Sequence, residues 1–172
     1  MKKIGVISDT HSYLDNKIYT VFNEVDEIWH AGDIGSLKVL ESLQKFKPTR
    51  AVFGNIDDAQ IRLATASELF FEIENCTVYI NHYGGSPNKY DPRVIDKLNS
   101  LKPNLFICGH SHILRVQRDA NKNNMLFVNP GAAGIHGFHK MKTCVRFTID
   151  NSIIKNFEVV ELGLRSKLNT TL

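Results

Sequence analysis

Short apolar runs recur along the sequence, and most of them end at a side chain that can bind a metal ion. In the N-terminal half, these runs alternate with segments whose apolar residues recur every three or four positions, a pattern typical of strands alternating with helices. The pitch is close to that of a βαβ unit, about 30 residues. Because a crossover helix joins parallel neighbours, we expect a parallel sheet in this half.

The second half has a different pattern, with two expected hairpins, at Asn75-Cys76 and at Asp150-Asn151. In chain order, the expected strands are residues 3–8, 27–30, 50–53, 69–74, 77–81, 105–108, 126–129, 143–149 and 153–160, and the expected helices are 16–25, 37–46 and 91–101. We predict an α/β fold, a four-layer αββα sandwich in which two mixed β-sheets pack face to face with flanking helices. One domain should span residues 1–162, and the polar tail 163–172 should be frayed.

Composition narrows the class of protein. The chain of 172 residues is 42% hydrophobic, which is enough for one domain with a full core. A net charge of +3 without runs of like charge is too weakly basic for a nucleic-acid-binding protein. No apolar stretch approaches the roughly 20 residues that span a bilayer. Three scattered cysteines, without a CxxC pair, favour reduced thiols and therefore a cytoplasmic location.

Seven polar side chains stand where predicted strands end: Asp9, His11, Asp33, Asn55, His82, His110 and His112. Each has a simpler explanation when taken alone: Asp9 could cap a turn, Asp33 could bond its own backbone, and Gly54-Asn55 is an ordinary turn. Parallel strands, however, open their carboxyl ends onto one crevice. The series therefore predicts a shared two-metal site.

The ordered motifs resemble those of the calcineurin-like metallophosphoesterases, particularly the small bacterial and archaeal phosphodiesterase branch. The chain carries them as Ser-Asp-Thr-His, His-Ala-Gly-Asp, Gly-Asn, His82, Gly-His-Ser-His and Asn-Pro-Gly, between Ile4 and Gly131. The resemblance implies that one metal is held by Asp9, His11 and His112, and a second by Asn55, His82 and His110. Asp33 would bridge the two ions. Asp33, Asn55 and His82 are the residues that we assign directly to catalysis.

The ligand chemistry agrees with the resemblance. Nitrogen and oxygen ligands without thiolate favour two divalent ions of the Mn, Fe, Ni or Zn type over Ca²⁺, and we favour Mn. Such ions lower the pKa of a bound water from about 15.7 toward neutral. The expected reaction is hydrolysis of a small-molecule phosphodiester by a metal-bridging hydroxide.

The chain departs from the superfamily pattern at two places. Ile56 follows Gly54-Asn55, where many members have a histidine, and Tyr83 follows His82, where the family usually has His-Gly-His. We expect Tyr83, His136 and His139 to contact substrate. The alternatives for the last two are exposed loop histidines.

Some expectations concern residues around the site and the surface. His30 should brace the site, Arg62 should be a phosphate contact or an ordinary surface charge, and Trp29 with Phe70-Phe71 should lie in the core or at a subunit contact. The superfamily also contains a trafficking subunit that binds proteins. Because Ile56 cannot donate a proton, a catalytically weak interaction scaffold stays as the alternative function, and a homo-oligomer stays an open alternative.

Overall fold

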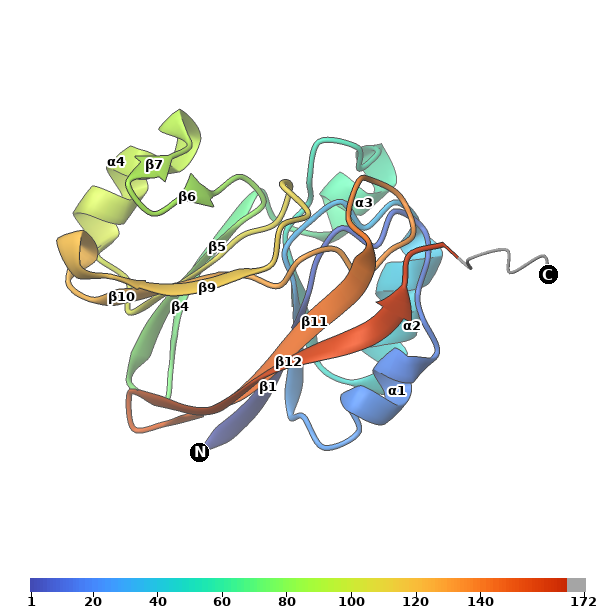
Figure 1. The fold of residues 1–172 in the computed structure, drawn as a ribbon, viewed down its shortest axis with the longest axis horizontal. Helices are drawn as coiled ribbons and strands as arrows, with labels where there is room; N and C mark the ends of the chain where they lie inside the picture. The colour runs from blue at the N-terminus through green and yellow to red at the C-terminus, as the bar shows by residue number, and fades with distance from the viewer. Residues whose placement is uncertain (167–172) are drawn as a thin grey trace.

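The computed structural model describes residues 1–166, in which two five-stranded mixed sheets pack face to face (Figure 1). In the first sheet, β1, β2 and β3 are parallel; β11 pairs antiparallel with β1, and β12 pairs antiparallel with β11. Its order is β12-β11-β1-β2-β3, with bounds β1 Lys2–Ile7, β2 Glu27–His30, β3 Thr49–Ala51, β11 Met141–Asp150 and β12 Ile153–Leu164.

The second sheet has a parallel centre, β5-β8-β10, and an antiparallel strand at each edge. Its order is β4-β5-β8-β10-β9, with bounds β4 Glu68–Ile73, β5 Cys76–Asn81, β8 Leu105–Ile107, β9 Arg115–Asp119 and β10 Met125–Asn129. A small separate hairpin pairs β6 (Gly85–Ser86) with β7 (Lys89–Tyr90).

Helices cover the outer faces of both sheets (Figure 1). Those beside the first sheet are α1 Lys17–Val21, α2 Leu37–Phe46 and α3 Ala59–Ala64, while α4 Pro92–Leu101 lies beside the second, and η1 spans Ala120–Lys122. The layer order confirms the predicted αββα sandwich. The alternation of apolar runs and amphipathic segments was enough to predict this architecture, because each apolar sheet face must pack against another layer.

Three apolar clusters correspond to the three interfaces between layers. The central one packs Trp29, Val78 and Ile107 between the sheets, which confirms the core assignment of Trp29. Phe71 packs against this cluster, whereas Phe70 is 48% exposed. The outer clusters join Leu40 of α2 and neighbours to the first sheet, and Leu98 of α4 and neighbours to the second.

Several predicted elements were wrong in extent. The helix predicted at 16–25 ends at Val21. Phe22 and Val25 are buried in the turn that follows, so their apolar spacing reflects burial and not a longer helix. Both hairpin turns lie one residue away from the predicted positions: the residue pairs Glu74-Asn75 and Asn151-Ser152 have positive φ. Neither α3 nor β9 was predicted; β9 is a largely exposed polar edge strand, so it lacks an apolar pattern.

The chain end and the cysteines bear on two other expectations. We predicted a frayed tail from residue 163, but β12 continues to Leu164, so that prediction was wrong for Gly163 and Leu164. Residues 167–172 lie outside the described residues. The three cysteines are free and buried. Within residues 1–166, every helix is too short or too polar to cross a membrane.

Candidate metal centre

All seven polar side chains at the strand ends lie at one edge of the sandwich, where the loops of both sheets meet. Backbone hydrogen bonds tie these loops together: Asp9 N donates to Gly32 O (3.0 Å), and Gly109 N donates to His82 O (3.0 Å). Asp9 also links the sheets through its side chain, since Oδ1 accepts from His110 N at 3.2 Å. Loops from both sheets therefore form the crevice.

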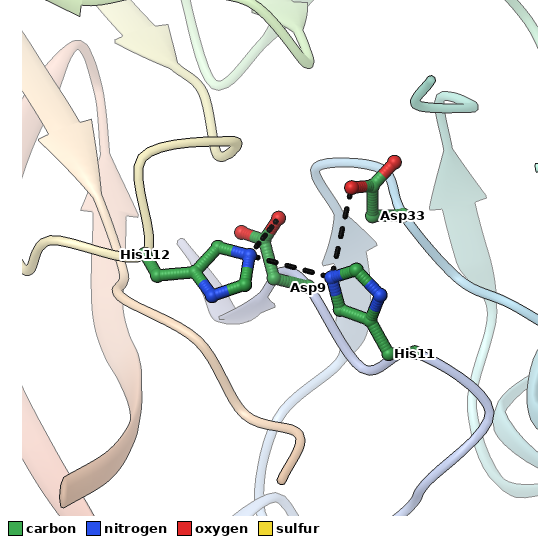
Figure 2. Close-up of side chains that lie close together, drawn as sticks. All are labelled: Asp9, His11, Asp33 and His112. Atoms are coloured by element: carbon green, nitrogen blue, oxygen red, sulfur yellow. Dashed lines mark hydrogen bonds and ion pairs between the residues drawn. The ribbon is translucent and has the colours of Figure 1, made fainter. Parts of the chain in front are cut away.

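Asp9, His11, Asp33 and His112 form the first group, with ligand atoms within 4.8 Å of one another (Figure 2). His112 Nε2 lies 3.3 Å from Asp9 Oδ1, and His11 Nε2 lies 3.6 Å from Asp33 Oδ2. The two Nε2 atoms are 3.3 Å apart. Four potential ligand atoms thus converge on one point.

Asp33 also belongs to a second group, with His82 and His110. Its Oδ1 lies 3.3 Å from His82 Nε2. Asn55 completes this group, because its Oδ1 is 3.2 Å from His82 Nε2 and 2.9 Å from His110 Nδ1. The two carboxylate oxygens of Asp33 therefore face different groups.

The backbone at the site is unusual, because five of the seven residues have left-handed φ angles: Asp9 (54°), His11 (44°), Asp33 (54°), His110 (66°) and His112 (58°). This conformation costs a residue other than glycine about 1–2 kcal/mol. Strained residues cluster at functional sites, where the surrounding structure holds them in place. The backbone strain at these five residues is therefore consistent with a functional site.

Bonds from neighbouring residues fix the ligand orientations. His82 Nδ1 donates to Ala31 O at 2.8 Å, which leaves Nε2 facing the site. His30 is fully buried, with Nε2 2.9 Å from Thr10 Oγ1 and Nδ1 accepting from Gly32 N at 3.2 Å. It therefore braces the site loops, as expected.

Asp57 is a brace that the sequence did not reveal to us, although it follows the Gly-Asn motif. Its buried carboxylate accepts from Ile34 N (3.1 Å), Gly35 N (2.7 Å) and Gly54 N (2.8 Å). These donors belong to the loops that carry Asp33 and Asn55. One carboxylate thus sets the separation of two potential ligands.

Electrostatics at the site favour cations. Burial opposes the charged form of His82, but its bond to Asp33 and the field of Asp9 outweigh burial and raise its pKa. The hydrogen bond to Asp9 raises the pKa of His112 despite burial. Burial would raise the pKa of Asp33, yet the bond from His82 and its charge lower it. Ionised Asp33 and its imidazole neighbours thus form a cation-attracting cluster.

The imidazoles of His11 and His110 differ from those of His82 and His112, because their pKa values are lowered. Burial lowers the pKa of His11 and that of His110, more than the carboxylates nearby raise them. A neutral imidazole offers a free lone pair, which is the form that binds a metal ion.

A cavity of about 530 Å³ opens over the two groups, lined by His11, Asp33, Asn55, His110 and His112 together with the loop 136–139. His136 lies with its ring centroid 4.9 Å from that of His11. His139 packs its ring against His112 (5.4 Å) and bonds Gly134 O through Nε2 (2.9 Å). Ile56, 44% exposed, also lines the cavity.

Tyr83 and Arg62 lie at the edge of the site, and neither is among the residues that line the cavity. The ring of Tyr83 packs on His82 (5.2 Å) and His110 (5.0 Å). The guanidinium of Arg93, which the sequence did not single out, lies 3.8 Å over the Tyr83 ring. Arg62 is exposed, as expected of a surface charge, and its guanidinium donates to Asp57 O (2.7 Å) and Gly54 O (3.2 Å); a phosphate contact of Arg62 stays a prediction.

The donor set fits divalent ions of the first transition series. Carboxylate, imidazole and amide atoms converge without a thiolate. Within residues 1–166, Asp9 Oδ2 is buried and has no hydrogen-bond partner, a costly state for a carboxylate oxygen. An ion beside Asp9 would satisfy that oxygen. The residues could therefore hold one ion in each group, with Asp33 shared.

The fold and this donor set define a metallohydrolase-type centre, and comparison with known proteins gives the family. A family model described as the calcineurin-like phosphoesterase superfamily domain matches residues 1–152. The chain belongs to the calcineurin-like phosphoesterase superfamily.

Relatives and solved structures agree with this membership. A probable metallophosphoesterase of Methanothermobacter thermautotrophicus is 33% identical, with 75% of this chain and 76% of the relative covered. A phosphodiesterase of Methanocaldococcus jannaschii is 28% identical, covering 75% of this chain and 82% of its own. An archaeal phosphodiesterase structure superposes with a TM-score of 0.73 at 22% identity, covering 92% of this chain and 99% of that one.

A protein with a different description shares the fold. Vps29 from Entamoeba histolytica, in a structure described as complexed with Zn²⁺, has a TM-score of 0.70 at 17% identity. The alignment covers 94% of this chain and 99% of that one. At this identity, the likeness establishes the fold alone.

Proposed function

We propose that this chain is a binuclear divalent-metal-dependent phosphodiesterase. The observation that carries the proposal is the position of Asp33, which offers one carboxylate oxygen to each of two groups of potential ligands. Paired metals in hydrolases lie about 3.5–4 Å apart, and a bridging carboxylate suits that separation. Asp9, His11 and His112 would complete one site, and Asn55, His82 and His110 the other.

When bound, two divalent ions supply an activated water as nucleophile and screen the charge of the phosphoryl oxygens. The residues of the chain hold the ligand atoms in place before substrate arrives, which avoids reorganisation during the reaction. Hydrolysis forms a bond from the water oxygen to phosphorus and breaks the bond to the leaving oxygen. Because Ile56 has no proton to donate, the leaving group departs as an anion or takes its proton from solvent or from a loop side chain such as His136.

His136, His139 and Tyr83 are proposed to act on the substrate side. His136 lines the cavity beside His11 and is exposed, so its imidazole can reach a phosphoryl oxygen. His139 also lines the cavity, but its bond to Gly134 O limits its freedom. Tyr83 would act indirectly, since its ring packs on His82 and His110.

The finer choices rest on chemistry and on relatives. A phosphodiester substrate is favoured by the relative named a phosphodiesterase. Mn²⁺ is favoured on the carboxylate and amide oxygens of the donor set, whereas the imidazoles also suit Fe, Ni and Zn. The three free, buried cysteines favour a reducing compartment such as the cytoplasm.

Hydrolysis of bis(p-nitrophenyl) phosphate tests the proposal. Purified protein loaded with Mn²⁺ should release p-nitrophenolate, and Asp33→Asn, which keeps the shape but removes the charge, should lower kcat/KM at least about 100-fold, since bridging charge stabilises the transition state. Equal rates for the wild type and Asp33→Asn would contradict the proposal.

A second candidate, an interaction scaffold, is favoured by the apolar rim of the cavity. Ile56 (44%), Ile113 (63%) and Phe138 (103%) are exposed around its mouth. Exposed apolar patches often mark binding surfaces. Metal analysis separates the two functions: protein that holds no metal, and gains no activity when Mn²⁺, Ni²⁺ or Zn²⁺ is added, favours the scaffold.

A further inference from the structure

A second cavity lies beside the candidate metal centre, and we name it the side pocket. It has a volume of about 450 Å³ and is lined by residues of the β6–β7 hairpin, the start of α4, β9 and β10. Figure 1 shows the β6–β7 hairpin and α4 lying above strands β9 and β10 on one side of the molecule. Ligand pockets commonly have about 300–1,000 Å³. The side pocket is therefore large enough for an aromatic group.

The side pocket and the cavity over the ligands share a wall. Ser111 and Ile113 line both. Ser111 stands between the two potential ligands of this loop, His110 and His112. Asn129 fixes the loop, because its Nδ2 donates to Gly109 O (2.8 Å) and Ser111 Oγ (3.0 Å). A substrate bound at the ligands can therefore extend over Ser111 into the side pocket.

The walls of the side pocket suit a flat ring. Tyr90, which is half-buried, contributes an aromatic face, and its ring packs against Phe127 with the two centroids 6.2 Å apart. Phe127 is fully buried, and the Tyr90 hydroxyl is anchored by donating to Asp119 Oδ2 at 2.5 Å. Both rings are thus held before any ligand binds, which lowers the entropy cost of binding.

The charges of the side pocket suit an anion. Lys89 and Arg115 line it. Asp91 lines it too, but its carboxylate accepts from Arg93 N (2.9 Å) and pairs with the Arg93 guanidinium (3.6 Å). The unpaired charge on the lining is therefore positive, which complements a phosphodiester anion.

Reaction geometry decides which part of a diester faces the side pocket. In-line displacement places the attacking and leaving oxygens on opposite sides of phosphorus. An oxygen that attacks from the ligand side directs the leaving group toward the cavity mouth. The other ester group, which stays on phosphorus, points sideways. We infer that the side pocket binds this retained group and selects diesters in which it is an aromatic ring, an inference that rests on the proposed function.

Two substrates with the same leaving group test the inference. Bis(p-nitrophenyl) phosphate retains an aromatic group, whereas methyl p-nitrophenyl phosphate retains a methyl group. Ser86→Trp should fill the side pocket, since Ser86 lines it on β6. This variant should lower the ratio of kcat/KM, diaryl over methyl ester, by about tenfold or more, the worth of a buried ring. Ser100→Trp, on the exposed face of α4, controls for an added indole.

A binding measurement gives a readout independent of turnover. Diphenyl phosphate, whose phenol leaves poorly, is titrated into ¹⁵N-labelled, zinc-loaded protein. The amide signals of Gly85 and Ser86 should shift in the wild type and in Ser100→Trp, and that of Gly85 should not shift in Ser86→Trp. The amide of Ser111, which also lines the cavity over the ligands, should shift in all three and reports binding of the phosphate there. Dimethyl phosphate should leave Gly85 unshifted in all three.

The outcomes separate the two proposals. If the wild type hydrolyses neither substrate, the proposed function is overturned, and the inference with it. If the wild type hydrolyses both, while Ser86→Trp changes neither the substrate ratio nor the diphenyl phosphate shifts, only the side pocket is overturned.

Discussion

Gly54 lies directly against the carboxylate of Asp33: a Cβ atom at position 54 would overlap Oδ1 of Asp33. The same oxygen accepts from Ile56 N at 3.1 Å, and Gly54 N donates to Asp57 at 2.8 Å. The loop after β3 and the loop after β2 are therefore interlocked. The φ of Gly54 is not in the left-handed range, so this position requires glycine because the Asp33 carboxylate lies so close to it.

Gly54→Ala should weaken metal binding strongly. The added methyl group must displace either the Asp33 carboxylate or the loop that carries Asn55, and the two candidate metal sites share Asp33. A misplaced ligand typically costs about 10–100-fold in metal affinity. Isothermal titration with Mn²⁺ measures the effect. Ile56→Ala, two residues along the same loop, is the control and should bind as the wild type does; equal affinity of Gly54→Ala would show that the contact is unimportant.

The left-handed backbone of His110 predicts that the residue lowers the stability of the fold. His110→Gly and His110→Ala both remove the imidazole and its contact with Asn55, but only glycine adopts φ 66° without strain. The metal-free glycine variant should therefore be more stable by about 1 kcal/mol. Urea unfolding of the two variants measures this difference. A more stable alanine variant would mean that the strain is relieved elsewhere.

Ile56→His should restore a proton donor at the cavity wall. The rate should rise more for esters with poor leaving groups, such as phenyl esters, than for p-nitrophenyl esters, because only a basic leaving oxygen needs the proton. General acid catalysis contributes about 10²–10⁴-fold at most. Rates of both ester classes for wild type and variant provide the measurement, and Ile56→Asn is the control. An equal effect on both classes would place position 56 away from the leaving oxygen.

Stability in acid should depend on the pair of Asp15 with Lys142, which ties the loop after β1 to β11. Burial would raise the pKa of Asp15, but the hydrogen bond from Lys142 outweighs it, so the folded pKa lies below the ordinary 3.8. A lowered pKa stabilises the fold above the unfolded value, and this contribution is lost as the pH falls through the folded pKa.

Lys142→Met should therefore cost about 1–3 kcal/mol near neutral pH, since both side chains are largely removed from water. The difference from the wild type should shrink as the pH falls below 3.8. Denaturant unfolding between pH 7 and pH 3, about the range in which such carboxylates titrate, measures it. Lys155→Met breaks an exposed pair with Asp150 and should change stability little. A difference independent of pH would indicate lost packing instead.

The sequence predicted the layers and the meeting of seven side chains because both follow from strand ends. Asp33 and His82 each end or follow a buried strand, and parallel strands bring such positions to one edge. Strand β9 could not be predicted in this way, since four of its five residues are exposed and its polarity carries no period. Propensity and pattern fail at edges, where burial does not select residues.

The braces around the site were beyond the sequence for a different reason. Asp57 holds two loops that are neighbours only after folding, so its role depends on the register of the sheet. Arg93 reaches Tyr83 from α4, and nothing in the spacing of the two residues announces this contact. The position of Arg62 similarly reflects two backbone carbonyl groups that no pattern of side chains encodes.

Anomalous scattering from crystals soaked in Mn²⁺ tests the central claim most directly. Two peaks should appear, about 3.5–4 Å apart as in other paired-metal hydrolases. One should lie among Asp9, His11 and His112 and the other among Asn55, His82 and His110, with Asp33 between them. A single peak, or peaks away from Asp33, would contradict the binuclear centre.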